Sequence, residues 1–246
     1  MLQRGTAGAI DPSQGVFETT LVVDGRAVEV DAHLARLEAS VRELYGMPLP
    51  ENARSLIEAG AAGLALGRLR LTVVPGQEPT VRTAEVEAAL VFPKEGIEVA
   101  PVTVPGGIGG HKWADRRLLD RATEEVAPAV PLVVDEDGSV LEGSRSNVFA
   151  VIGGAVVAPP TDGRILPGVA RARAIELARA AGIEVVERGL SVDELATAEE
   201  VFMTGGVRGV EPVGRCAGVG EWDSGEITAR VAAELQHAWL AADSSS

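Results

Sequence analysis

Two lysines stand apart in a chain whose other basic residues are all arginines. Lys94 and Lys112 are the lysines among 22 basic residues. A primary amine forms a Schiff base with an aldehyde, whereas a guanidinium does not. Lys94 lies in an expected exposed turn at residues 92–96, but Lys112 follows a glycine-rich stretch and precedes an expected helix. Lys112 is therefore the better candidate for covalent chemistry.

Other common catalytic patterns find little support. His33, His111 and His237 form no H-x-x-x-H pair, and the single cysteine, Cys216, allows no CxxC, so we expect no metal site. No G-x-S-x-G or Walker motif occurs. The glycines at 106–110 do not have dinucleotide-binding spacing and are typical of a flexible connection.

The amino-acid composition limits the classes of partner that the chain could bind. With 46% hydrophobic residues, the 246-residue chain can form a sizeable core. Its net charge of -14 argues against nucleic acid, which needs a clustered positive surface. The polar start at 1–10 has no signal core, no apolar run approaches membrane length, and the serines at 244–246 indicate a frayed tail. We therefore expect a cytoplasmic protein without a membrane partner.

The elements that must position these residues follow an α+β pattern. Within the first expected helix, Leu34, Leu37, Val41 and Leu44 recur at helical spacing and should face the core. Asp31 is its expected N-cap. The expected helices are 31–45, 51–65, 113–125, 169–181, 192–196 and 227–241. The expected strands are 15–23, 27–30, 67–74, 83–92, 97–104, 132–135, 139–142, 147–152, 155–158, 183–188 and 201–204.

Four segments, in this order, resemble the class IV aminotransferase family, which contains branched-chain and D-amino-acid aminotransferases and aminodeoxychorismate lyases. The segments are 15–19 with 33–37, His111-Lys112, 141–149, and 166–169 with 200–206. The resemblance extends from about Gly15 to Val213. Each segment alone is weak, but the ordered set is specific.

The resemblance implies a two-domain fold-type IV enzyme similar to D-amino-acid aminotransferase. A smaller N-terminal α/β domain is expected over residues 1–93 and a larger C-terminal domain that binds pyridoxal 5'-phosphate (PLP) over residues 94–246. The cofactor would lie between the domains. The family also implies a homodimer and small-molecule amino acid and keto acid substrates.

The resemblance also assigns roles to individual residues. Lys112 would carry PLP as a Schiff base, and Glu142 would hold the pyridine nitrogen protonated. The implied phosphate ligands are Arg36, the helix start at Val169 and Ala170, and the glycines Gly205 and Gly206. Phe17 and Arg208 are the implied substrate-binding residues, with Arg208 able to clamp a carboxylate.

Each assignment has a simpler alternative. Arg36 could be a polar-face helix residue, Glu142 a solvated hairpin end, and Arg208 a surface arginine in a loop. The glycines could be ordinary turn residues.

The chain also departs from the family pattern. Hydroxyl residues frequent in the family are absent at Ala170 and Gly206, an aromatic hydroxyl is absent at Phe17, and Asp115 replaces an asparagine. Because of these departures, the resemblance predicts neither the turnover rate nor the substrate class.

Three functions fit these residues. The first is an aminotransferase acting on an α-amino acid. The alternative is a 4-amino-4-deoxychorismate lyase that releases pyruvate and 4-aminobenzoate. A degenerate, non-catalytic relative is the third, against which the retention of Lys112 argues.

Overall fold

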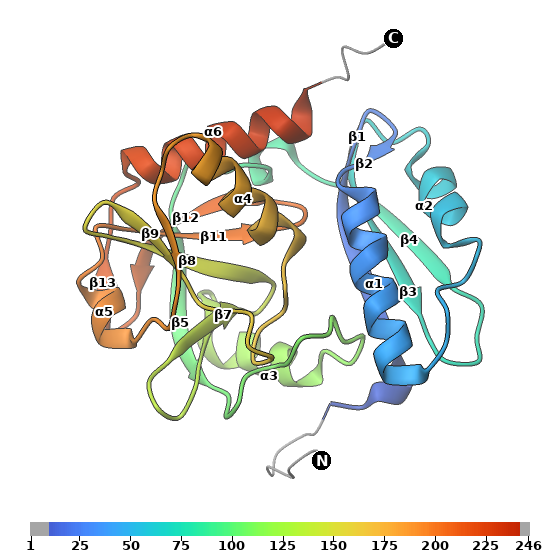
Figure 1. The fold of residues 1–246 in the computed structure, drawn as a ribbon, viewed down its shortest axis with the longest axis horizontal. Coiled ribbons are helices and arrows are strands. Elements are labelled where there is room, and N and C mark those ends of the chain that lie inside the picture. Colours follow the sequence, from blue (N-terminus) through green and yellow to red (C-terminus); the bar gives the residue numbers. More distant parts are fainter. Residues whose placement is uncertain (1–9, 242–246) are drawn as a thin grey trace. The chain divides into compact units, whose positions relative to one another are not determined.

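The computed structural model describes residues 10–241, which form two compact units (Figure 1). Unit 1 holds the described residues up to Ala88 together with His111–Arg121, and unit 2 holds Ala89–Gly110 together with the described residues from Ala122. The chain first passes from unit 1 to unit 2 after Ala88, a few residues before the expected domain boundary at 93. The expected domains did not include the second segment of unit 1, His111–Arg121. The serine-rich end and the polar start, apart from Ile10, lie outside the described residues.

Unit 1 contains a four-stranded antiparallel sheet in the order β2-β1-β3-β4, with two helices against one face. Its elements are β1 (Val16–Val23), β2 (Arg26–Ala27), α1 (Val30–Tyr45), α2 (Ala53–Ala61), β3 (Leu66–Val73) and β4 (Thr80–Glu85), after a 3-10 turn at Pro12–Gln14. Alternate residues of β1 and β3 enter one hydrophobic core. In α1, Leu34, Leu37 and Val41 are buried in that core and Leu44 packs against it, which confirms the predicted face.

The segment between β1 and α1 agrees with the expectation at its turn but differs at the return strand and at the start of the helix. Asp24 and Gly25 both have positive φ angles, as a two-residue hairpin requires, so the predicted turn is confirmed. However, the return strand is only β2, because Glu29 adopts a left-handed conformation and α1 starts at Val30. Asp31 pairs with Arg54 and does not cap the helix, so its predicted role as N-cap is wrong.

The expected strand at 83–92 is also wrong beyond residue 85. β4 pairs with β3 from Thr80 to Glu85 and ends where its partner strand begins, so later residues have no neighbouring strand there. Residues Ala88–Leu90 form a 3-10 turn instead. α2 is shorter than expected, because the chain leaves the helix at Ala62 before Gly63, which has a positive φ angle.

Unit 2 contains a nine-stranded sheet in the order β10-β9-β8-β11-β12-β5-β6-β7, with β13 beside β12. Its strands are β5 (Ile97–Thr103), β6 (Val130–Val134), β7 (Val140–Gly143), β8 (Ser146–Ile152), β9 (Ala155–Ala158), β10 (Val185–Glu187), β11 (Glu200–Gly205), β12 (Gly209–Cys216) and β13 (Gly220–Glu221). Because β7 also pairs with β8, the pairing closes a ring through β8, β11, β12, β5, β6 and β7.

The remaining helices are α3 (Arg117–Val126), which begins in unit 1 and ends in unit 2, and α4 (Val169–Ala180), α5 (Val192–Ala196) and α6 (Glu226–Leu240), which belong to unit 2. α4 and α6 pack on each other and on β11 (Figure 1). The hydrophobic core of unit 2 includes Val148, Val201 and Met203 from the strands and Leu195 from α5. The α+β fold class is thereby confirmed, although β12 was not expected. Within the described residues no helix combines the length and apolar character that crossing a bilayer demands.

Candidate active site

Lys112 is fixed by backbone bonds to the first strand of unit 1. The amide of Phe17 donates to the Lys112 carbonyl at 2.9 Å, and the amide of Ala114 donates to the Gly15 carbonyl at 3.0 Å. A β-bridge joins Val16 and Trp113 between them. This extended pairing explains why α3 begins at Arg117 and not at 113, as was expected. By contrast, Lys94 is exposed.

Gly15 is required for this pairing. Its φ angle is +89°, and a Cβ there would lie 2.2 Å from the Val73 carbonyl oxygen. Any larger residue would push β1 and β3 apart where Lys112 is held.

Two cations lie over the Phe17 ring. The Lys112 Nζ is 5.2 Å and the Arg70 Cζ 4.1 Å from the centroid of its ring. Burial lowers the pKa of Arg70, and the nearby charges of Arg68 and Arg82 lower it further. Arg70 was not among the predicted residues, although its alternation with Leu69 and Leu71 places it on the sheet face opposite the core.

Arg36 forms part of a buried charge cluster. Its Nε and Nη2 donate to the two Glu18 carboxylate oxygens at 2.8 and 2.6 Å, and His33 Nδ1 lies 2.7 Å from Glu18 Oε2. Burial alone would raise the pKa of Glu18, but the His33 hydrogen bond and the Arg36 charge outweigh it and lower the pKa to about 2. Arg36 is therefore held in place and is not a solvated surface residue.

Asp115 fastens the end of the lysine segment. Its carboxylate accepts from the Asp11 amide at 2.9 Å and from Arg117 Nε and Nη2 at 2.9 and 2.7 Å. The Arg117 hydrogen bond holds the pKa of Asp115 well below its usual range. An asparagine could not pair with Arg117 as an ion, so the departure from the family pattern has a local structural reason.

In unit 2, Glu142 is buried at the end of β7. Its Oε2 accepts from the Leu166 amide at 3.2 Å, and its backbone pairs with Asn147 of β8. A solvated hairpin end is therefore the wrong description of Glu142. The Leu166 bond ties this carboxylate to the turn that leads into α4.

Asn147 connects β7, the turn that leads into α4, and β11. Its Nδ2 donates to the Leu166 carbonyl at 2.9 Å, and its backbone pairs with Thr204, next to Gly205. A Cβ on Gly168 would lie 2.0 Å from the Asn147 Oδ1, so only glycine fits beside it. No role was predicted for Asn147 beyond its place in the resembling segment, because its partners come from three separate elements.

The start of α4 suits an anion. Its N-cap, Gly168, provides no side-chain hydrogen bond, so the amides of Val169 and Ala170 have no side-chain acceptor from the cap. Gly205 ends β11 next to Gly206, and a Cβ on Gly205 would make only ordinary contacts, the nearest at 3.6 Å. By residue chemistry, the lysine and arginine of unit 1 suit the aldehyde and phosphate of PLP, and the buried carboxylate and helix start of unit 2 suit its pyridine nitrogen and phosphate.

Arg208 is also paired. Its Nη1 lies 2.9 Å from Oε1 of Glu211, whose side chain is 3% exposed, and its carbonyl accepts from the Phe92 amide. Burial and the charge of Arg208 lower the pKa of Arg145, against the opposite effect of Glu211. Two arginines thus share the surroundings of one buried carboxylate. Arg208 is not an unattached surface arginine.

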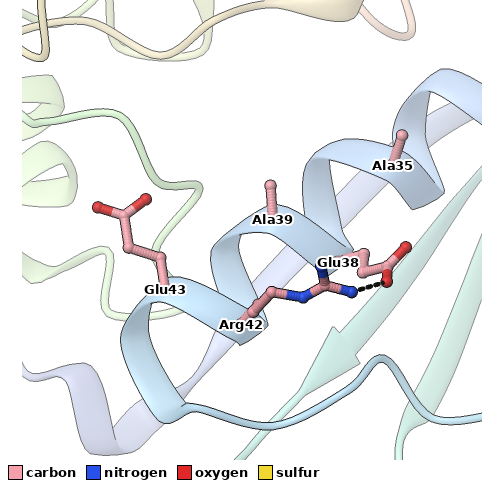
Figure 2. A pocket seen from close by; sticks show the side chains of 5 residues that line it. All are labelled: Ala35, Glu38, Ala39, Arg42 and Glu43. Atoms are coloured by element: carbon pink, nitrogen blue, oxygen red, sulfur yellow. Dashed lines mark hydrogen bonds and ion pairs between the residues drawn. The ribbon is translucent and has the colours of Figure 1, made fainter.

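A hollow on α1 contains none of the predicted residues. Ala35, Glu38, Ala39, Arg42 and Glu43 line it, and Figure 2 shows Glu43 set apart from the Arg42–Glu38 ion pair. Among the described residues no cluster of three His, Cys, Asp or Glu side chains could hold a metal ion.

Comparison with known proteins identifies the family. Residues 15–216 match the model of the amino-transferase class IV family. This chain belongs to the class IV aminotransferase family. The predicted resemblance is therefore confirmed, and so is the expectation of an enzyme, because the similar family members are transaminases or lyases.

The most similar members include both activities. A putative branched-chain-amino-acid aminotransferase of Methanocaldococcus jannaschii is 27% identical over 88% of this chain and 84% of its own. A hypothetical aminotransferase from Mycobacterium tuberculosis, solved with α-ketoglutarate and PMP, has a TM-score of 0.83 at 26% identity over 97% of this chain and 95% of its own. The 4-amino-4-deoxychorismate lyase of Pseudomonas aeruginosa has a TM-score of 0.74 at 27% identity over 96% of each chain.

The family also implies the cofactor, because the Mycobacterium tuberculosis protein has been solved in a PLP-bound form. The class IV chain described here holds the predicted residues in two groups. Unit 1 contains Phe17, Arg36 and Lys112, and unit 2 contains Glu142, Val169, Ala170, Gly205, Gly206 and Arg208.

Proposed function

We propose that this chain is a PLP-dependent aminotransferase that transfers an amino group between an α-amino acid and a keto acid, with PLP attached to Lys112. The observation that carries the proposal is the anchoring of Lys112, whose carbonyl is bonded to β1 and whose amine lies 5.2 Å from the Phe17 ring centroid. A primary amine on a fixed backbone suits both covalent attachment and proton transfer.

Lys112 and Glu142 would have different roles in the reaction. PLP, when bound, supplies an electron sink for negative charge on the substrate carbon. Lys112 would remove the proton from that carbon and return it through Nζ. Glu142, buried and bonded to the Leu166 amide, would keep a proton on the pyridine nitrogen. Neither role requires a metal ion.

The phosphate would be held by charge and by backbone amides. Arg36 keeps its guanidinium oriented through the bidentate bond to Glu18, and the first turn of α4 offers the amides of Val169 and Ala170. Gly205 and Gly206 would add amides from the end of β11. Backbone groups thus replace the two hydroxyls that the family often has.

Arg70 joins Phe17 as a proposed substrate-binding residue. Its guanidinium lies against the same ring that Lys112 approaches, on the sheet face opposite the hydrophobic core. A planar cation there can bind a substrate carboxylate in bidentate fashion.

A lyase acting on 4-amino-4-deoxychorismate is the second candidate. The similarity to the Pseudomonas aeruginosa lyase and the presence of Arg208 favour it. However, the ion pair with buried Glu211 offsets the charge of Arg208, which weakens the case for a dicarboxylate clamp. We therefore rank the aminotransferase first and a non-catalytic relative, motivated only by lost hydroxyls, last. The resemblance also supports a homodimer, which sedimentation of the purified chain would test.

The two reactions differ in what accumulates without an acceptor. The holoenzyme should be mixed with a panel of D- and L-amino acids in the absence of a keto acid, and pyridoxamine phosphate should be measured. 4-Amino-4-deoxychorismate should be supplied in parallel and pyruvate measured. We expect pyridoxamine phosphate from at least one amino acid, and none with Lys112→Arg, which controls for contaminating enzymes. Equal release of pyruvate and 4-aminobenzoate, with no amino acid converted, would establish the lyase instead.

A further inference from the structure

His111 directly precedes Lys112 and makes contacts for which the proposed function has no use. Its Nδ1 lies 3.0 Å from the Ser40 Oγ, and its Nε2 lies 3.7 Å from the Glu43 Oε1. Its ring meets Trp113 edge-on, with the centroids 5.2 Å apart. The His111 side chain is 16% exposed, so the imidazole ring is largely sheltered from water. All of these residues belong to unit 1.

One face of α1 supplies both polar partners. Ser40 and Glu43 are three residues apart, so they lie on the same side of the helix and can meet the two nitrogens of one imidazole. The two contacts are unequal. Ser40 is buried, and a buried hydroxyl without a partner is costly, whereas the Glu43 side chain is 75% exposed and water competes for its contact with the ring. The Ser40 contact is therefore the one that holds the ring.

This contact anchors the chain directly in front of the lysine. The last amide of the glycine-rich stretch that bonds the Arg164 carbonyl is that of Gly109, and Gly110 follows it. His111 follows the glycine-rich residues 106–110, and it is the residue at which the chain returns to unit 1. Gly110 has no atom within 4 Å of where its side chain would begin. On the other side of the lysine, the Trp113 bridge and the Phe17 bond already fix the backbone. His111 adds a side-chain anchor on the side that precedes the lysine.

We propose that His111 is a positioning residue, which fixes the peptide in front of Lys112 through Ser40 and so keeps the ε-amine over the Phe17 ring. Only the covalent role of Lys112 rests on the proposed function. The anchoring itself is a property of unit 1 and involves no cofactor. Displacing a reacting group by about 1 Å can cost roughly 100-fold in rate, so a backbone anchor next to the lysine has a measurable effect.

Two amide substitutions separate the nitrogens of the imidazole. The amide of His111→Asn reaches the position of Nδ1 and can keep the Ser40 bond, whereas that of His111→Gln reaches toward Nε2 and Glu43. Both remove the aromatic ring, so each controls for lost packing in the other. Ser40→Ala removes the partner, and Glu43→Gln tests the exposed contact. Thermal unfolding of each variant shows whether it is folded.

The first readout needs no cofactor. Hydrogen exchange of the Phe17 and Ala114 amides, whose bonds hold the lysine segment, should be measured in the purified protein. We expect His111→Gln and Ser40→Ala to speed this exchange by about 10-fold, equivalent to about 1.4 kcal/mol. His111→Asn and Glu43→Gln should stay within about two-fold of wild type. Equal exchange in the Asn and Gln variants, or unchanged exchange in His111→Gln, would overturn the proposal.

The second readout follows added PLP. The rate at which a borohydride-reducible link to Lys112 forms should fall by about 10-fold in His111→Gln and recover in His111→Asn. If the wild-type chain forms no such link, the proposed function fails, while the exchange pattern still decides the role of His111. If the link forms equally fast in His111→Gln and in the wild type, the positioning role is excluded and the proposed function stands.

Discussion

At the scale of single residues, the Glu18 carboxylate links stability to pH. Its pKa is lowered to about 2 from an ordinary value of 4.5, because the hydrogen bond of His33 and the charge of Arg36 outweigh its burial. A carboxyl whose pKa is lower in the folded state stabilises the fold above its unfolded pKa. This contribution is lost as the pH falls from about 4.5 toward 2.

Glu18→Gln should therefore reduce the free energy of unfolding near pH 7 by about 3 kcal/mol, since it leaves Arg36 beside a neutral amide. The difference between variant and wild type should shrink as the pH is lowered from about 4.5 toward 2. Denaturant unfolding over that pH range measures it. Glu38→Gln, which breaks the exposed pair with Arg42, is the matched control and should cost no more than about 0.5 kcal/mol. A pH-independent difference for Glu18→Gln would contradict the assigned pKa.

At the scale of elements, the start of α4 depends on Gly168. A Cβ there would lie 2.0 Å from the Asn147 Oδ1, so alanine must displace the side chain that bonds the Leu166 carbonyl. Gly168→Ala should lower stability by about 1–3 kcal/mol and weaken PLP binding at the same time. Thermal unfolding and a PLP titration measure the two effects. Gly189→Ala, where no atom lies within 4 Å, should change neither, and a tolerated alanine at 168 would remove Asn147 from the site.

Elements with strong local signals could be predicted from the sequence. α5 spans Val192–Ala196, as expected, because Ser191 and Glu194 form a capping box that is visible in the sequence. β12 was missed because its glycines and Pro212 read as a turn, whereas its pairing with β11 and β5 depends on distant residues. β4 was placed too late because the apolar residues 88–92 resemble a strand but have no strand partner.

At the scale of the whole molecule, residue type was enough to find part of the candidate site. Lys112 was selected by the chemistry of an amine, and Glu142 by its place in a family segment. The surroundings of these residues could not be found in this way. Glu18 lies on β1 and its partner Arg36 on α1, and Asn147 contacts three separate segments. Both sets of contacts therefore depend on the tertiary structure. The return of His111–Arg121 to unit 1 depends on the bridge between Val16 and Trp113 and on the flanking backbone bonds to Gly15 and Phe17, which no periodicity encodes.

Reductive trapping shows directly whether PLP is attached to Lys112. The purified chain should be incubated with PLP, reduced with borohydride, digested and examined by mass spectrometry. We expect a pyridoxyl group on the peptide that contains Lys112, its loss in Lys112→Arg and its retention in Lys94→Arg. A pyridoxyl group on Lys94 instead, or no adduct on either lysine, would show that Lys112 does not carry the cofactor.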